Sequence, residues 1–407
     1  MTGLRIGFLF NHEQIHHVAH SLPIALALAR GDPDVTIVIA TTNARLRAEV
    51  IRLGEGLVGS RIGLVELDLT RWSSRALKGG FKALRPAADP LVYRDNLAFF
   101  RELDVLVVTE TSALVLKTRH GLRGLLIVYA RPGGGDRAMA VKNFGPGFNL
   151  VLCSGDKVRE RLIADGGMNP SRIAVVGYPK FDAAMGGETY PLVDDGRPVV
   201  LYNPHVSPDL SSWYSIGREI LDWFAEREDY RLIFAPHVML FERRFVVKID
   251  KQLLYRSGRI EDRYLRAPNI HIDLGSRAST TLAYTNRADI YLGDASSQIY
   301  EFLRRPRPCV FLNPRGLPWR QDRNFPHWRM GRVITTAREL RQALPEAEVD
   351  HFGIYRERQA AMFAERVDLT DEPSSVRAAR AIANLAGLPT DGVAPLPTPE
   401  PQTVGEK

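Results

Sequence analysis

The chain has 407 residues and a mass of 45.6 kDa, so two or three domains with separate cores are expected rather than one. Hydrophobic residues make up 45% and charged residues 25%, which are globular values and exclude wholesale disorder. The formal net charge of +7 favours an anionic partner, such as a phosphate, a nucleic acid or an acidic membrane.

Short apolar segments alternate with amphipathic helical patterns along the first half of the chain. Strands are predicted at 4–10, 35–40, 63–69, 104–109, 125–130, 150–155 and 173–177. Helices are predicted between most of them, at 15–30, 43–53 and 156–166. Apolar strands separated by helices are typical of parallel sheets covered on both faces. Residues 1–183 are therefore expected to form a Rossmann-like domain.

The pattern breaks at 184–198, which has the Gly, Pro and Asp content of a linker. It then restarts, with strands predicted at 199–203, 231–236, 269–274, 288–293 and 309–313, and helices at 211–227, 242–256 and 296–304. A second Rossmann-like domain is expected at 199–345, followed by helices at 346–388 and a Pro-rich disordered tail at 389–407. The predicted fold class is α/β, with two doubly wound domains facing a central cleft.

The expected setting is cytoplasmic. Cys153 and Cys309 stand in apolar runs in different halves of the chain, which predicts buried thiols rather than a disulfide scaffold. No run reaches the roughly 18 apolar residues of a membrane-spanning helix. The N-terminus also lacks the basic segment of a signal peptide.

The strongest candidate site is the segment ADIYLGDASSQIYEFL at 288–303, where a strand ends and a helix begins. Unpaired N–H groups at a helix start attract a phosphate, and the hydroxyls of Ser296 and Ser297 would add donors. Asp294 and Ser297 could instead simply cap the helix. Eight arginines follow between 304 and 332, of which one or two could hold a diphosphate.

Two histidines follow predicted strands in the second half, His205 in LYNPH and His237 in IFAPH. Both should project from carboxyl ends of strands, where an imidazole can donate to phosphate or transfer a proton. A purely structural role is the alternative for each of them.

Two segments of the first domain could reach a ligand. The loop YARPGGGDRA at 129–138 has three glycines that permit close backbone approach, and it carries Asp136 and Arg137. In NHEQIHHVAH, His12, His16 and His20 are four residues apart. Metal binding is not expected there, because no carboxylate or cysteine partner is evident; an acceptor contact through His12, Glu13 or His16 is favoured over it, with solvated histidines as the alternative.

The segment 71–85 places basic residues at helical spacing beside apolar ones. It could be a helix that rests on anionic lipid, although Gly79 and Gly80 weaken a helix and a solvated basic loop fits equally well. No GxGxxG opens a helix after a strand, and no GxxxxGK[ST] motif is present. The basic residues match no nucleic-acid-binding module, so no nucleic-acid partner is expected.

These motifs together resemble the CDP-glycerol glycerophosphotransferase family. The resemblance lies in DIYLGDASSQIYEFL followed by PRPCVFLN, in VVGYPKFD at 175–182, and in the paired LYNPH and IFAPH strand ends. It implies the GT-B fold, donor phosphates bound by Ser296 and Ser297 with Asp294 nearby, and His237 as the second-domain histidine. It also implies no metal and no cofactor.

The glycine loop departs from that family. Its members have a His-Gly pair there, whose histidine is implicated as the base, whereas this loop reads Arg-Pro-Gly-Gly-Gly-Asp-Arg at 131–137. Asp136 or a residue of the 11–20 segment, such as His16, would then act as the base, or the activity differs or is lost.

Three hypotheses follow. The first is a metal-independent transferase that moves a glycerophosphate or glycosyl group from a nucleotide-diphosphate donor to a polyol, glycan or lipid-linked acceptor in cell-envelope polymer synthesis. The second is a UDP-sugar 2-epimerase-like isomerase, with Glu110 and Asp136 as the first-domain acids. The third is a non-catalytic nucleotide- or glycan-binding protein.

Overall fold

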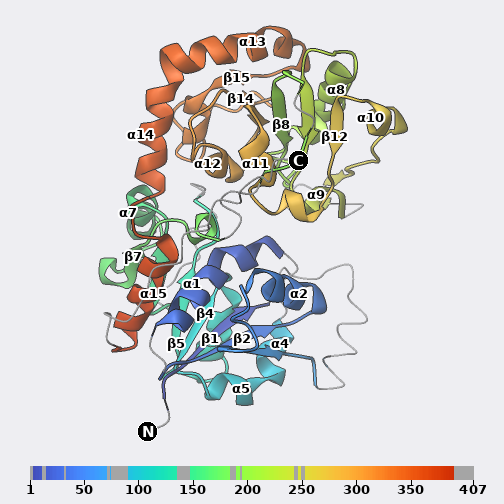
Figure 1. Cartoon of the computed structure of the whole chain (residues 1–407). Helices are drawn as coiled ribbons and strands as arrows, with labels where there is room; N and C mark the ends of the chain where they lie inside the picture. Colours follow the sequence, from blue (N-terminus) through green and yellow to red (C-terminus); the bar gives the residue numbers. More distant parts are fainter. Residues whose placement is uncertain are drawn as a thin grey trace, which may run out of the picture. The chain divides into compact units, whose positions relative to one another are not determined.

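The computed structural model describes residues 3–11, 15–31, 34–70, 74, 90–134, 147–183, 189–192, 195–242, 246–248 and 253–388. Within this part, the chain forms two compact units. The first contains the described residues up to 134, then 147–183 and 366–388, and the second contains 189–365. Each unit is built on one parallel sheet with helices packed against it (Figure 1).

The first sheet has seven strands in the order β3-β2-β1-β4-β5-β6-β7, all parallel. The strands are β1 Arg5–Phe10, β2 Thr36–Thr41, β3 Ile62–Glu66, β4 Val105–Val108, β5 Leu126–Ala130, β6 Leu150–Cys153 and β7 Ile173–Val175. Each predicted strand of the first half is present. β1 is central, because Phe8 pairs with Ile39 of β2 on one side and Val107 of β4 on the other.

Helices cover both faces of this sheet because its strands are apolar on both sides. Phe8 and Phe10 pack in one core with α1, α2 and α15, while Leu9 packs in the other with α4, α5 and α7. The helices are α1 Val18–Arg30, α2 Ala44–Leu53, α4 Pro90–Asp95, α5 Leu97–Arg101, α6 Val115–Thr118 and α7 Asp156–Ala164.

The second sheet has six parallel strands in the order β12-β9-β8-β13-β14-β15. They are β8 Val199–Asn203, β9 Arg231–Phe234, β12 Ile270–Ile272, β13 Ile290–Gly293, β14 Cys309–Leu312 and β15 Arg332–Ile334. One face packs on α8 Trp213–Ala225, α10 Asp262–Arg266 and α13 Leu340–Asp350. α12 Gln298–Phe302 meets the other face, where the rings of Phe302 and Tyr291 lie 5.5 Å apart. α9 Met239–Glu242 and α11 Ala283–Arg287 complete this set.

The predicted helix at 242–256 is wrong. The described residues of that stretch form an antiparallel pair, β10 Val246–Lys248 and β11 Leu253–Tyr255. Two valines begin β10, and β-branched side chains favour strands over helices. The apolar periodicity alone did not distinguish a hairpin from an amphipathic helix.

The last helices of the described chain are divided between the two units. α13 continues through a π-helical turn, His351–Tyr355, into α14 Arg356–Arg366, and the side chain of Gln359 in α14 donates to the carbonyls of Arg307 (3.0 Å) and Met330 (2.7 Å) of the second unit. α15 Ser374–Leu385 packs instead on α1 of the first unit (Figure 1). The chain therefore returns to its first unit at the end.

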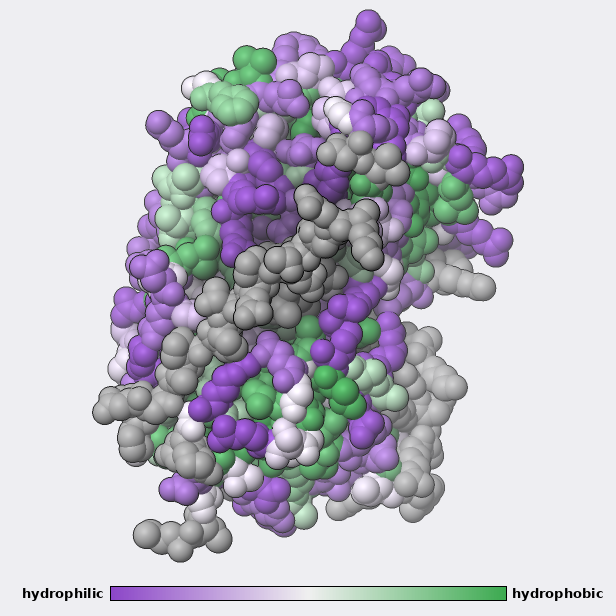
Figure 2. Space-filling view, viewed as in Figure 1, coloured by the Kyte–Doolittle hydropathy of each residue, from purple (hydrophilic) through white to green (hydrophobic). Residues whose placement is uncertain are grey.

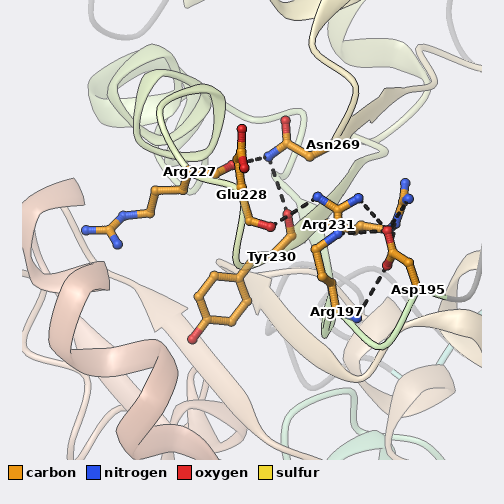
Figure 3. A network of polar contacts seen from close by, with 7 residues as sticks. All are labelled: Asp195, Arg197, Arg227, Glu228, Tyr230, Arg231 and Asn269. Carbon is orange, nitrogen blue, oxygen red and sulfur yellow. Dashed lines mark hydrogen bonds and ion pairs between the residues drawn. The ribbon is translucent and has the colours of Figure 1, made fainter.

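The amino edge of the second sheet is tied together by charged and amide groups (Figure 3). Asp195, just before β8, accepts hydrogen bonds from Arg231 (3.0 Å) and Arg197 (2.8 Å), and these guanidinium groups hold the pKa of its carboxyl well below the usual range. Asn269, just before β12, donates to the carbonyls of Arg227 (2.7 Å) and Tyr230 (3.3 Å). These residues lie where the strands begin, so we assign them to holding the sheet together.

On the coloured part of the face drawn in Figure 2, hydrophilic residues are interspersed with groups of apolar residues. Both cysteines are buried and unpaired, as the apolar runs predicted. Among the described residues, no helix is both long enough and apolar enough to cross a membrane.

Candidate functional site

Each sheet has one switch point, which is the place where the order of the strands reverses. It lies between β1 and β4 in the first sheet and between β8 and β13 in the second. In open α/β sheets the loops diverge at such a point, and ligands bind there, outside the carboxyl ends of the strands. In the second unit, His205 follows β8, and Asp294, Ser296 and Ser297 follow β13. Four residues predicted to bind donor phosphates thus stand at one switch point.

Asp294 connects the segments around this point. Its carboxylate accepts hydrogen bonds from the backbone N–H groups of His205 (2.9 Å), Ser212 (2.7 Å) and Ala295 (2.7 Å), and from the hydroxyl of Ser212 (2.9 Å). The side chain has no exposed surface. Asp294 therefore holds the loop after β8 and the start of α8 against the end of β13.

Burial raises the pKa of Asp294 to about 6, although the hydrogen bonds from Ser212, His205 and Ala295 favour the charged form. A carboxylate enclosed in this way is poorly placed to touch a ligand. Its geometry suits a residue that positions others, including His205.

His205 and His237 follow neighbouring strands in matching turns. Nδ1 of His205 accepts from the backbone N–H of Ser207 (2.9 Å), and Nδ1 of His237 accepts from that of Met239 (3.3 Å). In each neutral ring the proton must then reside on Nε2, the nitrogen farther from the backbone. The ring centroids are 5.9 Å apart. The structure thus brings two N–H donors together beside the switch point, an arrangement suited to an anion.

The two serines lie at the start of α12 and are partly buried. The Ser296 hydroxyl accepts from the backbone N–H of Gln298 (3.2 Å), and the Ser297 side chain makes no capping bond. α12 spans only Gln298–Phe302, so its dipole adds little to anion binding. The hydroxyls and backbone N–H groups would then be the main ligands that this segment offers.

The sequence did not single out two residues that complete this site. Nε2 of His327 lies 3.2 Å from the carbonyl oxygen of Asp294, and Nε1 of Trp328 donates to the same oxygen at 3.0 Å. Both are buried. They come from a 3-10 helix, Pro326–Met330, more than 30 positions from Asp294 along the chain. In the sequence, only the tripeptide Pro-His-Trp could have drawn attention to them.

Most of the arginines between 304 and 332 have structural partners. Arg307 is partly buried and donates to the carbonyls of Thr285 (2.8 Å) and Phe302 (2.6 Å), and desolvation lowers its pKa to about 10. Arg332 pairs with Asp350 at 2.6 Å. Arg315 follows β14 and contacts Asp209 (3.2 Å) in the loop after β8, so it is the member of this set that lies beside the switch point.

Of the other predicted residues, His16 belongs to the first unit. His16 lies in the 3-10 turn Ile15–His17, with its ring 4.6 Å from that of His17 and 6.5 Å from that of His20. No group of three or more potential metal ligands occurs in the described part of the chain. Asp136, Arg137 and the basic segment 71–85, apart from Ser74, lie outside the described residues.

The switch point of the first sheet carries a carboxyl group, Glu110, just after β4. Its Oε1 accepts from the hydroxyl of Tyr93, and its Oε2 accepts from the backbone N–H (2.5 Å) and hydroxyl of Ser112. Burial raises the pKa of Glu110 above its ordinary value. Each unit thus has a buried carboxyl at its switch point.

The chain resembles known proteins in fold. A scan against models of protein families finds no match, and a search of curated protein sequences finds none. Among solved structures, S. aureus MnaA with UDP is 14% identical, with a TM-score of 0.59 over 97% of this chain and 100% of that chain. The wall teichoic acid polymerase TagF, as a variant soaked with CDPG, is 13% identical, with a TM-score of 0.59 over 95% and 90%.

A third structure is the UDP-GlcNAc 2-epimerase from Neisseria meningitidis bound to UDP-GlcNAc, which is 13% identical with a TM-score of 0.53 over 94% of this chain and 99% of that one. Such likenesses span nearly the whole chain and show a GT-B-like fold. The predicted fold class, two doubly wound α/β domains of the GT-B type, is confirmed.

Proposed function

We propose that the protein is a metal-independent GT-B transferase. It would move a glycerophosphate or glycosyl group from a nucleotide-diphosphate donor, CDP-glycerol-like, to an acceptor hydroxyl. The observation that carries this proposal is the set of donors at the second switch point: the Nε2 atoms of His205 and His237 and the hydroxyls of Ser296 and Ser297. Fixed donors of this kind stabilise the charge of a leaving nucleotide without cofactor or metal.

The roles follow from the geometry. Ser296, Ser297 and His205 would bind the donor phosphates, while His237 would donate to the leaving phosphate or transfer a proton to it. Asp294 would keep His205 in place. The fold of TagF, whose structure was soaked with CDPG, supports a nucleotide donor. Arg137 at the phosphates and Asp136 or His16 as the base stay predictions.

The remaining predictions concern the acceptor and the location of the protein. The acceptor would be a polyol, a glycan or a lipid-linked hydroxyl compound of the cell envelope, and no nucleic acid is expected. We also predict that the protein is cytoplasmic and that residues 71–85 hold it peripherally at the inner face of an anionic membrane.

A thermal-shift panel of CDP, UDP, GDP, ADP and CMP tests nucleotide binding. A ligand at 100 times its Kd adds about 2.7 kcal/mol of stability. We expect one nucleoside diphosphate to stabilise the wild type selectively, with CDP pointing to a glycerophosphate donor and UDP to a sugar donor. A panel with no response would contradict the proposal.

Replacing Ser297 by Ala should weaken binding of that nucleotide by about tenfold or more, because a hydrogen bond to a charged group contributes about 1.5–3 kcal/mol. The matched control is Ser279→Ala, which removes a hydroxyl of the segment after β12 that donates to the carbonyl of Ser276 (2.6 Å). Equal nucleotide affinity in Ser297→Ala and the control would exclude Ser297 from the phosphate site.

A second candidate function is a UDP-sugar 2-epimerase-like isomerase. It is favoured by Glu110, a buried carboxyl at the first switch point, and by the epimerase structures that share the fold. The two reactions differ in their need for an acceptor. Turnover of UDP-GlcNAc with no acceptor added would establish the isomerase and exclude the transferase.

A further inference from the structure

The first unit has its own ligand-binding position, at the switch point between β1 and β4. Asn11 follows β1 and Glu110 follows β4 at this point, and both side chains hydrogen-bond the hydroxyl of Tyr93. Two loops and α4 thus converge on one phenol and one carboxylate. The three groups come from separate parts of the sequence, so the fold itself assembles them.

The carboxylate is held in a fixed orientation. Tyr93 is fully buried and donates to Oε1, and its hydroxyl lies 3.2 Å from the Ser112 hydroxyl. Ser112 donates to Oε2 through both its N–H and its hydroxyl. Glu110 as a residue is only partly buried, whereas Asp294 at the other switch point has no exposed surface.

The surroundings poise Glu110 for proton transfer. Burial raises its pKa, while the hydrogen bonds from Ser112 and Tyr93 act in the opposite direction. Tyr93 stays neutral, since burial and the charge of Glu110 raise its pKa well above 10. The other ionisable groups nearby are Tyr129, with a pKa raised by burial to about 12, and Arg131, whose charge acts on Tyr129. A base is most effective when its pKa lies near the working pH.

We propose that Glu110 is the general base that deprotonates the acceptor hydroxyl, an inference that rests on the transferase function proposed above. It takes the role for which the glycine loop lacks a histidine. The acceptor, a polyhydroxylated compound, binds at the switch point of the first sheet with one hydroxyl directed at the Glu110 carboxylate. Tyr93 and Ser112 act as positioning residues.

The step balances in atoms and electrons. The acceptor O–H bond breaks and its proton goes to a Glu110 carboxylate oxygen. The acceptor oxygen forms a bond to the donor phosphorus, or to the anomeric carbon of a sugar donor. The bond from that atom to the nucleotide oxygen breaks, and the nucleotide leaves with the electron pair. Glu110 then releases its proton to water, so no oxidant, reductant or further reactant is needed.

A structural role for Glu110 makes a different prediction. Its bond to the N–H of Ser112 caps the 3-10 turn Ser112–Leu114, so removal of the whole side chain would also disturb the loop. Glu110→Gln keeps the shape and an acceptor oxygen for that N–H but removes the basic carboxylate. It therefore separates proton transfer from support of the loop.

The experiment measures nucleotide release from CDP-glycerol and from UDP-GlcNAc, with glycerol as the acceptor probe. We expect Glu110→Gln to lower kcat by about 10²–10⁴-fold, the usual contribution of a general base, while CDP or UDP stabilises it as much as the wild type. The matched control is Glu102→Gln, whose carboxylate precedes β4 at the opposite edge of the sheet and pairs with Arg5 at 2.6 Å. Its turnover should stay that of the wild type.

Tyr93→Phe supplies a readout that a purely structural role would not change. Loss of the phenol removes a hydrogen bond that lowers the pKa of Glu110. Activity needs the carboxylate, so it rises as pH passes through this pKa. In Tyr93→Phe that rise should move to higher pH, with turnover retained at the plateau.

The outcomes of these experiments separate the role of Glu110 from the transferase function. Turnover of Glu110→Gln within threefold of the wild type, or an unmoved profile in Tyr93→Phe, would overturn the role of Glu110 and leave the transferase intact. Loss of nucleotide stabilisation in Glu110→Gln would assign the residue to folding and overturn it as well. A wild type that binds no nucleotide, or binds one without release, would overturn the proposed function, and the base assignment with it.

Discussion

At the scale of single residues, the two switch points use buried carboxyl groups differently. Asp294 is enclosed by four backbone and hydroxyl donors and has no exposed surface, so it can only position other groups. Glu110 is anchored by similar donors, but the residue is only partly buried. We therefore assign Asp294 to positioning other groups and propose Glu110 as the residue that exchanges a proton with a ligand.

Asp294 makes the free energy of unfolding fall as pH rises, which is opposite to the usual effect of a carboxyl group. Its folded-state pKa of about 6 lies above its ordinary value of 3.8, so the unfolded chain loses this proton first as pH rises. The group therefore costs stability increasingly between about pH 4 and 6. At 1.36 kcal/mol per pKa unit, the total is about 3 kcal/mol.

Asp294→Asn removes this titration. We expect the difference in unfolding free energy, wild type minus variant, to fall by about 2 kcal/mol from pH 4 to pH 7, because part of the total is already lost at pH 4. Urea unfolding of both proteins at pH 4, 5, 6 and 7 measures it. Stability curves that stay parallel over this range would show that the carboxyl of Asp294 is not perturbed as its burial implies.

At the scale of elements, α15 secures the first unit although it follows the second in sequence. Val376, Ala379 and Ile382 are buried against α1, and the Ser374 hydroxyl accepts from the backbone N–H of Tyr178 at 2.9 Å. Gly177 has a positive φ of 81°, and a Cβ there would lie 2.3 Å from the Ser374 hydroxyl. Only glycine lets the chain pass α15 this closely.

Ile382→Ala should destabilise the first unit by about 2–5 kcal/mol, because it removes buried methyl groups and leaves a cavity. Asn384→Ala, an exposed change in the same helix, should stay within about 0.5 kcal/mol of the wild type. Hydrogen exchange followed by mass spectrometry checks this through peptides of β6, a strand that α15 contacts. Unchanged exchange in β6 would mean that α15 contributes little to the unit.

The sequence predicted elements better than it predicted the site. Strands such as β1 and β13 are continuous apolar runs, and such runs are specific to buried parallel sheets. β15 was not predicted, because Arg332–Ile334 is short and begins with a charged residue. The partners of Asp294 lie 82 and 34 positions away, at Ser212 and Trp328, and one sequence holds no signal for contacts of that range.

At the scale of the whole molecule, the side chains that follow the strands at their carboxyl ends differ in chemistry between the two units. The second offers N–H and hydroxyl donors, from His205, His237, Ser296 and Ser297, and the first offers an acceptor, Glu110. Donor groups suit an anion, and an acceptor suits a hydroxyl that must lose its proton. In the function proposed above, the second unit would therefore bind the nucleotide and the first unit the acceptor.

This division predicts where a nucleotide acts. The nucleoside diphosphate that stabilises the protein should slow hydrogen exchange in the loops after β8, β9 and β13, at 203–212, 235–240 and 294–298, because its phosphates would order them. The amino edge around Asp195 and Arg231 is already tied by ion pairs and should not change. Protection at that edge, or none after β13, would place the nucleotide elsewhere and contradict the assignment of Ser296 and Ser297.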